Sequence, residues 1–319
     1  MPILGYGVYQ TPPEETERCV LDAIALGYRS IDTAQAYGNE EGVGAAIQKS
    51  GVPREELFVT SKIWISNGGY EKAKASIEES LRKLRTSYLD LMLIHQPFND
   101  YYGSYRAMEE AYKSGKIRAI GVSNFYSDRL IDICNFADVM PAVNQIETHV
   151  FQQQKEARKF LNKYNVRHES WGPFAEGRKD FFSNPVLKSI GEKYGKSVAQ
   201  TALRFLIQSR VIVIPKSTHA ERMEENFSVF DFSLSEQDMQ DNRRTRRKGK
   251  RILFALRSEH RRMADCIQQR QIVKIAKMAF GFLLWIFCGI LFAAEPEGIQ
   301  TKVAVIYFFR AGENYASAT

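Results

Sequence analysis

An alternation of strand-like and helix-like stretches runs through the first 230 residues and sets the fold. Short apolar runs such as YRSIDTA, LFVTSKI and YLDLMLIH are each followed by a longer amphipathic stretch, and the pattern occurs eight times. Strands that alternate with helices pair in parallel, and eight such units favour a closed barrel over an open doubly wound sheet. The sequence therefore predicts an α/β fold, a (β/α)8 TIM barrel.

The expected elements follow from this pattern. Strands are predicted at 3–9, 28–34, 57–63, 88–95, 117–124, 142–147, 166–171 and 211–216. Helices are predicted at 14–27, 39–50, 69–84, 104–115, 127–137, 153–164, 184–195, 197–209 and 220–230.

Four side chains that can handle a proton stand at or just after strand ends. They are Asp32, Tyr37, Lys62 and His95. Barrel enzymes build their active sites at the C-terminal ends of the strands. A free phenol has a pKa near ~10, too high for an efficient acid at neutral pH, and a nearby ammonium lowers it. A carboxylate can hold that ammonium and an imidazole can orient a carbonyl oxygen, so the set predicts a proton donor for a carbonyl.

The sequence motifs around these four residues resemble those of a known protein family. GYRSIDTAQAYGNEEGVGAAI, SKIW, LDLMLIHQP, GKIRAIGVSNF, NQIETH and VIVIPKS occur in this order. Over residues 2–240 the chain resembles the aldo-keto reductases, with the greatest likeness to bacterial diketogluconate and glyoxal reductases. The resemblance implies an NADPH-dependent carbonyl reductase. In it, Tyr37 is the acid, Lys62 its pKa partner, Asp32 the counter-ion of the lysine and His95 the group that orients the carbonyl.

The same resemblance implies a site for NADPH or NADP⁺. The nicotinamide would be held by Ser123, Asn124 and Gln145, with Trp171 against its face and Gly172, Pro173 and Phe174 following. The segment IPKSTHAERMEENF would bind the adenosine 2′-phosphate through Lys216, Ser217 and Arg222, and the ribose and adenine through Glu225 and Asn226. Charge-assisted bonds from Lys and Arg suit a phosphate. Each assignment has a competing interpretation. The polar residues at 123, 124 and 145 could cap strand ends, Trp171 could pack in the core, and the IPKSTHAERMEENF segment could be a solvated charged helix.

The remaining functional expectations concern the cofactor type, the substrate and rival functions. The sequence has no Gly-x-Gly-x-x-Gly fingerprint with a following helix, which argues against a Rossmann site. Aromatic residues Tyr9, Trp64 and Phe98 are predicted to line the substrate pocket. The reaction needs no metal. Two alternatives stay open: a non-catalytic barrel that binds NADPH as a sensor or regulatory subunit, and an inactive truncated product.

The charge distribution and the cysteine spacing indicate which partners and which cellular compartment to expect. The formal net charge of +7 comes from the last part of the chain, because residues 241–319 hold fifteen Lys and Arg against six Asp and Glu. The barrel part is near neutral, so we expect a small-molecule carbonyl substrate and no nucleic acid. Cys19, Cys134, Cys266 and Cys288 show neither disulfide nor metal-ligand spacing. A reduced cytoplasmic setting, no signal peptide and a monomer are the expectations.

Both ends depart from the family pattern. The start lacks the stretch that forms a hairpin in the family, and LSEQDMQ resembles the opening of the last barrel helix before a basic run with seven Lys and Arg in 243–251. We place the barrel at 1–240 and a non-family tail at 241–319, with no stable contacts from residue 243 onward. When the residues from Asp241 onward are back-translated and read one nucleotide further along, the shifted frame can encode sequences similar to the family ending. We therefore hypothesise a frameshift followed by read-through. The alternative is a membrane anchor at 279–294, although 16 apolar residues are short of the ~20 that span a bilayer.

Overall fold

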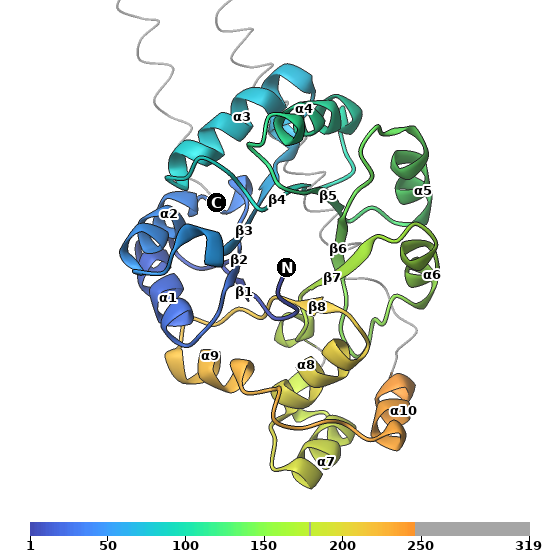
Figure 1. Ribbon diagram of the computed structural model, residues 1–319. Helices are drawn as coiled ribbons and strands as arrows, with labels where there is room; N and C mark the ends of the chain where they lie inside the picture. The colour runs from blue at the N-terminus through green and yellow to red at the C-terminus, as the bar shows by residue number, and fades with distance from the viewer. Residues whose placement is uncertain (179, 246–319) are drawn as a thin grey trace, which may run out of the picture. The chain divides into compact units, whose positions relative to one another are not determined.

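Eight parallel strands form the centre of the molecule in the computed structural model, which describes residues 1–178 and 180–245. They follow one another in chain order around the sheet (Figure 1). The strands are β1 Tyr6–Gly7, β2 Ser30–Asp32, β3 Phe58–Ile63, β4 Leu91–Ile94, β5 Ile120–Ser123, β6 Val143–Glu147, β7 Arg167–Trp171 and β8 Ile212–Val213. A parallel bridge between Leu4 and Val213 joins the first and last strands, so the sheet closes. The predicted TIM barrel is confirmed.

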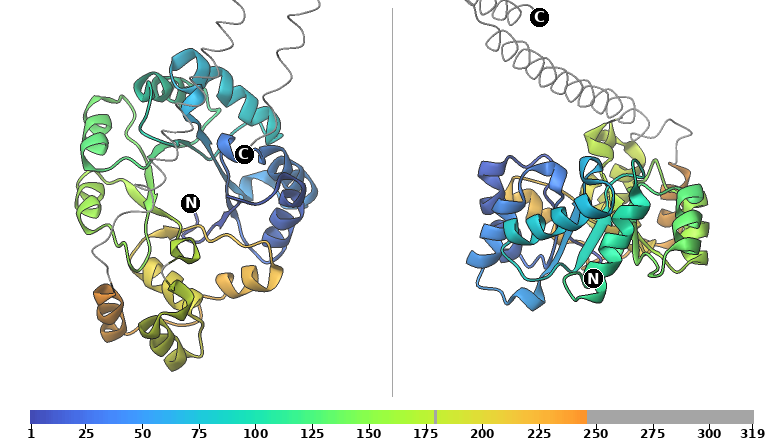
Figure 2. Two further views of the ribbon diagram at one scale, coloured as in Figure 1. Left: turned by 180° about the vertical axis from the view of Figure 1, so that it is seen from behind. Right: turned by 90° about the horizontal axis from the view of Figure 1, so that it is seen from above.

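Helices surround the strands on the outside, as both views of Figure 2 show. They are α1 Pro13–Ala25, α2 Glu40–Lys49, α3 Tyr70–Lys83, α4 Tyr101–Lys113, α5 Ser127–Phe136, α6 Lys155–Lys163, α7 Pro185–Tyr194, α8 Val198–Gln208, α9 Ala220–Phe227 and α10 Glu236–Arg244. Local signals set several ends. Ser197 and Gln200 form a capping box at the start of α8, and α7 ends at Gly195 with φ of 64°.

The interior of the barrel is divided into an apolar and a polar layer. Leu91, Leu93 and Val143 form a buried cluster with the partly buried Phe58 and Ala119. Strand side chains alternate between faces, so Lys62, four residues after Phe58, points to the same interior. It lies in register with Leu93 and is fully buried. The apolar cluster therefore forms a floor beneath the polar residues at the C-terminal strand ends.

The last described helix extends the contacts of the barrel beyond the predicted boundary. The Ser235 side chain accepts a hydrogen bond from the Asp238 amide at the start of α10, as expected for LSEQDMQ. The helix buries Met239 and Asn242. Gln153 donates to the carbonyl of Arg243, and the Thr245 hydroxyl donates to the carbonyl of Val150. The expectation that contacts end at residue 243 is thus wrong for Arg243 and Thr245.

The rest of the predicted tail, including the apolar segment 279–294, Cys266 and Cys288, lies outside the described residues. Among the helices that the structure describes, none combines the length and the apolar character that crossing a bilayer requires. Cys19 and Cys134 are buried free thiols.

A close helix contact gives a stability prediction. A Cβ on Gly44 of α2 would collide with the carbonyl oxygen of Lys83 and the backbone of Leu84 at the end of α3. Gly44→Ala should therefore force α2 and α3 apart and lower the free energy of unfolding by about 1–3 kcal/mol. Denaturant unfolding measures this change, with Gln48→Ala on the exposed side of the same helix as the control. Equal stability of the two variants would contradict the prediction.

Candidate active site

Lys62 is the centre of a buried ionic group at the C-terminal strand ends. Its Nζ donates to Asp32 Oδ1 at 2.5 Å, to the Thr33 carbonyl at 2.9 Å and to the Tyr37 hydroxyl at 3.3 Å. The side chains of Lys62 and Asp32 are 0% and 4% exposed. An ammonium is thereby fixed between a carboxylate and a phenol, in the arrangement that the sequence predicts.

Tyr37 and His95 lie at the mouth of the barrel. Tyr37 ends the 3₁₀ turn Gln35–Tyr37 and is half-buried. Its ring meets the ring of His95 edge-on, with 5.6 Å between the centroids, and His95 meets Trp64 edge-on at 4.9 Å. The four residues of the predicted set therefore come together, and we call them the tetrad (Asp32, Tyr37, Lys62 and His95).

The pKa of the phenol reflects opposing effects. Burial raises the pKa of Tyr37 to about 12, while the Lys62 ammonium lowers it and the Asp32 charge raises it. Burial lowers the pKa of Lys62, but the charge and hydrogen bond of Asp32 together with the charges of Tyr37 and Glu169 outweigh this effect, and the net pKa is raised. Lys62 therefore stays charged and offsets only part of the burial penalty on the phenol. The simple expectation of a lowered phenol pKa needs this correction for the resting protein.

The predicted residues at the ends of β5, β6 and β7 form one hydrogen-bonded chain. The Trp171 indole donates to Asn124 Oδ1 at 2.9 Å, and Asn124 Nδ2 donates to Ser123 Oγ at 3.1 Å and to the His95 carbonyl at 3.1 Å. The Ser123 hydroxyl donates to the Gln145 carbonyl at 2.9 Å. Asn124 adopts φ of 65°, a left-handed conformation that Asn tolerates. This chain fixes the rim of the barrel beside the tetrad.

Gln145 connects this rim to the tetrad and to a residue that sequence reasoning missed. Its Nε2 donates to Asp32 Oδ2 at 2.9 Å and to Glu169 Oε2 at 3.0 Å. Glu169 is 1% exposed, in the middle of β7. Burial and the charge of Asp32 raise its pKa to about 8. A signal existed in the sequence, because Glu169 lies two residues before Trp171 and must face the same side of the strand.

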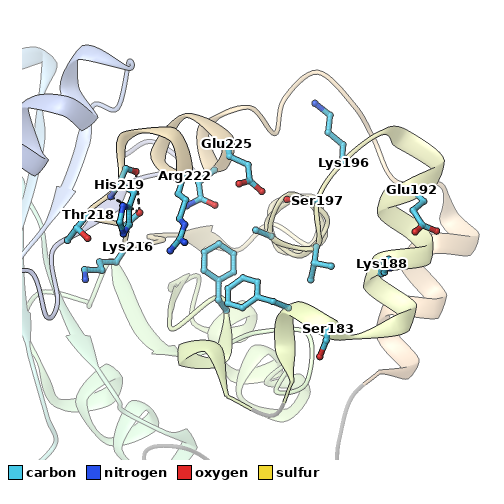
Figure 3. Close-up of a pocket in the computed structure, with 16 residues that line it drawn as sticks. Ser183, Lys188, Glu192, Lys196, Ser197, Lys216, Thr218, His219, Arg222 and Glu225 are labelled. Atoms are coloured by element: carbon cyan, nitrogen blue, oxygen red, sulfur yellow. Dashed lines mark hydrogen bonds between the residues drawn. The ribbon is translucent and has the colours of Figure 1, made fainter.

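A separate cavity of about 1000 Å³ lies beside α7, α8 and the segment after β8 (Figure 3). Among its lining residues are the predicted Phe174, Lys216, Ser217, Arg222, Glu225 and Asn226. Figure 3 shows Lys216 and Arg222 on one side, and Lys188 and Glu192 of α7 on the other. Thr218, His219 and Phe182 also line the cavity and were not predicted. The tetrad is not part of this cavity, so charge recognition and proton chemistry occupy different places.

The other predicted residues lie as follows. Gly172 has φ of 62°, and with Pro173 it begins the segment that leads from β7 to Phe174. The Tyr9 ring lies 5.1 Å from the Tyr37 ring and is 46% exposed, so it can meet a substrate. Phe98 is half-buried in the loop after β4, and its role stays a prediction.

Comparisons with known proteins give a family match and several similar proteins. The model of the "Aldo/keto reductase family" matches residues 4–246. The chain is 48% identical over 241 residues to a "Glyoxal reductase" of Bacillus subtilis, covering 75% of this chain and 87% of the relative. It is 40% identical over 242 residues to a "Methylglyoxal reductase" of Escherichia coli K12, with the same coverage. A solved structure of a Gox0644 variant, titled as in complex with NADPH, is 43% identical with a TM-score of 0.75, covering 79% of this chain and 92% of that one.

The fold, the site and these relatives lead to the same conclusion. The chain belongs to the aldo/keto reductase family and is an oxidoreductase that acts on carbonyl groups.

Proposed function

We propose that the protein reduces aldehydes and ketones to alcohols with NADPH, and that Tyr37 donates the proton to the carbonyl oxygen. One observation carries the proposal: the buried Lys62 ammonium stands 2.5 Å from the carboxylate of Asp32 and 3.3 Å from the hydroxyl of Tyr37. The relatives named for glyoxal and methylglyoxal reduction support small reactive carbonyls as the substrate class.

The described residues fit the cofactor. A cavity that joins Lys216, Ser217 and Arg222 supplies two cations and a hydroxyl, which suit a phosphate ester. Glu225 and Asn226 add polar groups for a ribose and an adenine. At the barrel rim, Ser123, Asn124 and Gln145 offer hydroxyl and amide groups for the carboxamide, and the Trp171 ring offers a flat surface. When bound, NADPH supplies the hydride for the reduction.

The protein side of the reaction is a proton transfer that the tetrad prepares. His95 stands against Tyr37 and Trp64, so a carbonyl at the mouth would meet imidazole and phenol together. As negative charge develops on the carbonyl oxygen, the Tyr37 hydroxyl gives up its proton. The Lys62 ammonium stabilises the phenolate that forms, and Asp32 keeps the ammonium in place. Solvent at the open mouth then returns a proton to the phenolate.

The function is tested by turnover of methylglyoxal. Purified protein should consume NADPH, followed by its absorbance, only when the carbonyl is present, and the alcohol should be identified as the product. Binding of NADPH without any turnover of a panel of aldehydes and ketones would reject the reductase proposal and favour a binding barrel.

Cofactor preference follows from the cations of the cavity. Arg222→Ala should weaken NADPH binding by about ten- to a hundredfold, the scale of a lost charged hydrogen bond, and leave NADH binding nearly unchanged. Tryptophan fluorescence titration with both cofactors measures the effect. Lys188→Ala removes a positive charge from the opposite side of the same cavity and is the matched control. Equal affinity of the parent protein for NADH and NADPH would sink the assignment.

A further inference from the structure

Glu169 is a carboxylate inside the barrel that the proposed proton transfer does not use. It lies on β7 in register with Gln145 of β6 and Ile212 of β8. Its Oε2 accepts a hydrogen bond from Gln145, while its buried Oε1 has no hydrogen-bond partner among the described residues. A fully ionised carboxylate in a dry interior would be expected to have more donors than one shared amide.

The charges that face Glu169 do not balance a second negative charge. Asp32 of β2 accepts the second hydrogen bond from the Gln145 amide group, and it also accepts the 2.5 Å hydrogen bond from Lys62 of β3. Lys62 acts on Glu169 only at longer range, because no ion pair joins the two within the part of the chain that the structure describes. The strands that flank β7 add no charge beside Glu169: its register partners are Gln145 of β6 and Ile212 of β8, and Gln145 in turn pairs with Ser123 of β5. One cation thus serves two buried carboxylates.

We propose that Glu169 is a positioning residue that carries a proton in the resting enzyme, so that no second negative charge beside Asp32 opposes the effect of the Lys62 ammonium on Tyr37. Its protonated carboxyl accepts from Gln145 and holds that amide against Asp32 without adding charge. The raised pKa of Glu169, caused by burial and by the charge of Asp32, agrees with this state. The inference rests on the proposed reductase function for its kinetic consequence only.

That consequence is a loss of acid strength in alkaline solution. When Glu169 ionises, a negative charge appears beside Asp32 and Lys62 in the closed interior. It makes the Tyr37 phenolate harder to form, so the phenol becomes a weaker acid and reduction slows. The protein should also lose stability. The folded-state pKa of about 8 lies above the ordinary value of 4.5, so the proton stabilises the fold fully below about pH 4.5 and this contribution is lost as the pH rises through about 8.

The test compares the parent full-length chain with Glu169→Gln, which keeps the shape and the neutral charge of the protonated acid. The ratio of the unfolding equilibrium constant of the parent to that of the variant should rise by about tenfold per pH unit between about pH 5 and pH 8. This measurement needs no turnover, so its result is independent of the reductase proposal. Glu71→Gln, at an exposed position on α3, should give a flat ratio. A flat ratio for Glu169→Gln would overturn the inference.

A kinetic arm and a spectroscopic arm complete the test. The fall in kcat between pH 6.5 and pH 9, measured with methylglyoxal and saturating NADPH, should be several-fold smaller in Glu169→Gln than in the parent. An equal fall would show that Glu169 does not act on Tyr37. If Glu169→Gln fails to fold, the infrared spectrum of the parent decides. A protonated carboxylic acid band that is present at pH 7 and lost above about pH 8 supports the inference, and the absence of such a band at pH 7 overturns it.

Discussion

Replacement of Tyr37 by Phe is expected to abolish carbonyl reduction while the protein still binds NADPH. The substitution removes the hydroxyl that lies 3.3 Å from Lys62 Nζ and keeps the ring that packs against His95 and Tyr9. A positioned general acid contributes about 10²–10⁴-fold to a rate, so turnover should fall by at least this range. Single-turnover consumption of NADPH with methylglyoxal measures the loss, and fluorescence titration measures the binding.

The control for this variant is Tyr112→Phe, because Tyr112 is an exposed tyrosine on α4. It should leave both measurements unchanged. Turnover by Tyr37→Phe at the rate of the parent would show that another group supplies the proton. Loss of NADPH binding together with turnover would mean that the hydroxyl is needed to hold the cofactor, and would contradict the prediction that it acts only as the proton donor.

Lys62→Met should reduce turnover and stability together. The variant leaves the Asp32 carboxylate buried without its cation, and breaking a buried pair from one side typically lowers the free energy of unfolding by about 3–5 kcal/mol. The phenol of Tyr37 also loses the charge that lowers its pKa, so the remaining activity should be confined to a different pH range. Denaturant unfolding and a pH profile of kcat measure the two effects.

The double variant Asp32→Asn with Lys62→Met separates these effects. With both charges gone, much of the stability should return, because no unpaired ion remains in the interior. Turnover should stay low, because the ammonium is still missing. A double variant that recovers turnover would refute the role of Lys62 in the proton transfer.

The sequence predicts the barrel well because each strand and helix carries its own pattern. The run Leu91–Ile94, for example, is apolar on both faces and fully buried, and the helix after it, α4, buries one side and exposes the other. The ends of the sheet are less predictable. The run at 3–9 gives only Tyr6–Gly7 as β1, and the run at 211–216 gives only Ile212–Val213 as β8. Pro215 has no amide hydrogen to donate to a ladder, which limits the last strand.

The grouping of the tetrad could be predicted because Asp32, Lys62 and His95 stand at or next to strand ends, Tyr37 follows Asp32 by five residues, and all four lie in family motifs. Glu169 and the double contact of Gln145 could not be read in the same way. They depend on the register of β6 against β7 and on a contact across the barrel to Asp32, 113 residues away in the chain. The pKa of Tyr37 was also beyond the sequence, since burial and two opposite charges compete in it. The extent of α10 was missed because polar contacts tie its end to the loop after β6. Gln153 donates to the Asn242 carbonyl, and the Thr245 hydroxyl donates to the Val150 carbonyl.

The separation between the cavity and the tetrad has a consequence for how such a protein can diversify. The proton-handling side chains come from the first 95 residues, whereas Lys216 and Arg222, the two cations proposed to bind the phosphate, come after the last strand. On the proposed function, mutations in the later segment can therefore change which dinucleotide binds without changing the residues of the tetrad. Recombination between related genes at a point between α4 and β7 would exchange the whole lining of this cavity as a unit, and on the proposed function the cofactor preference with it.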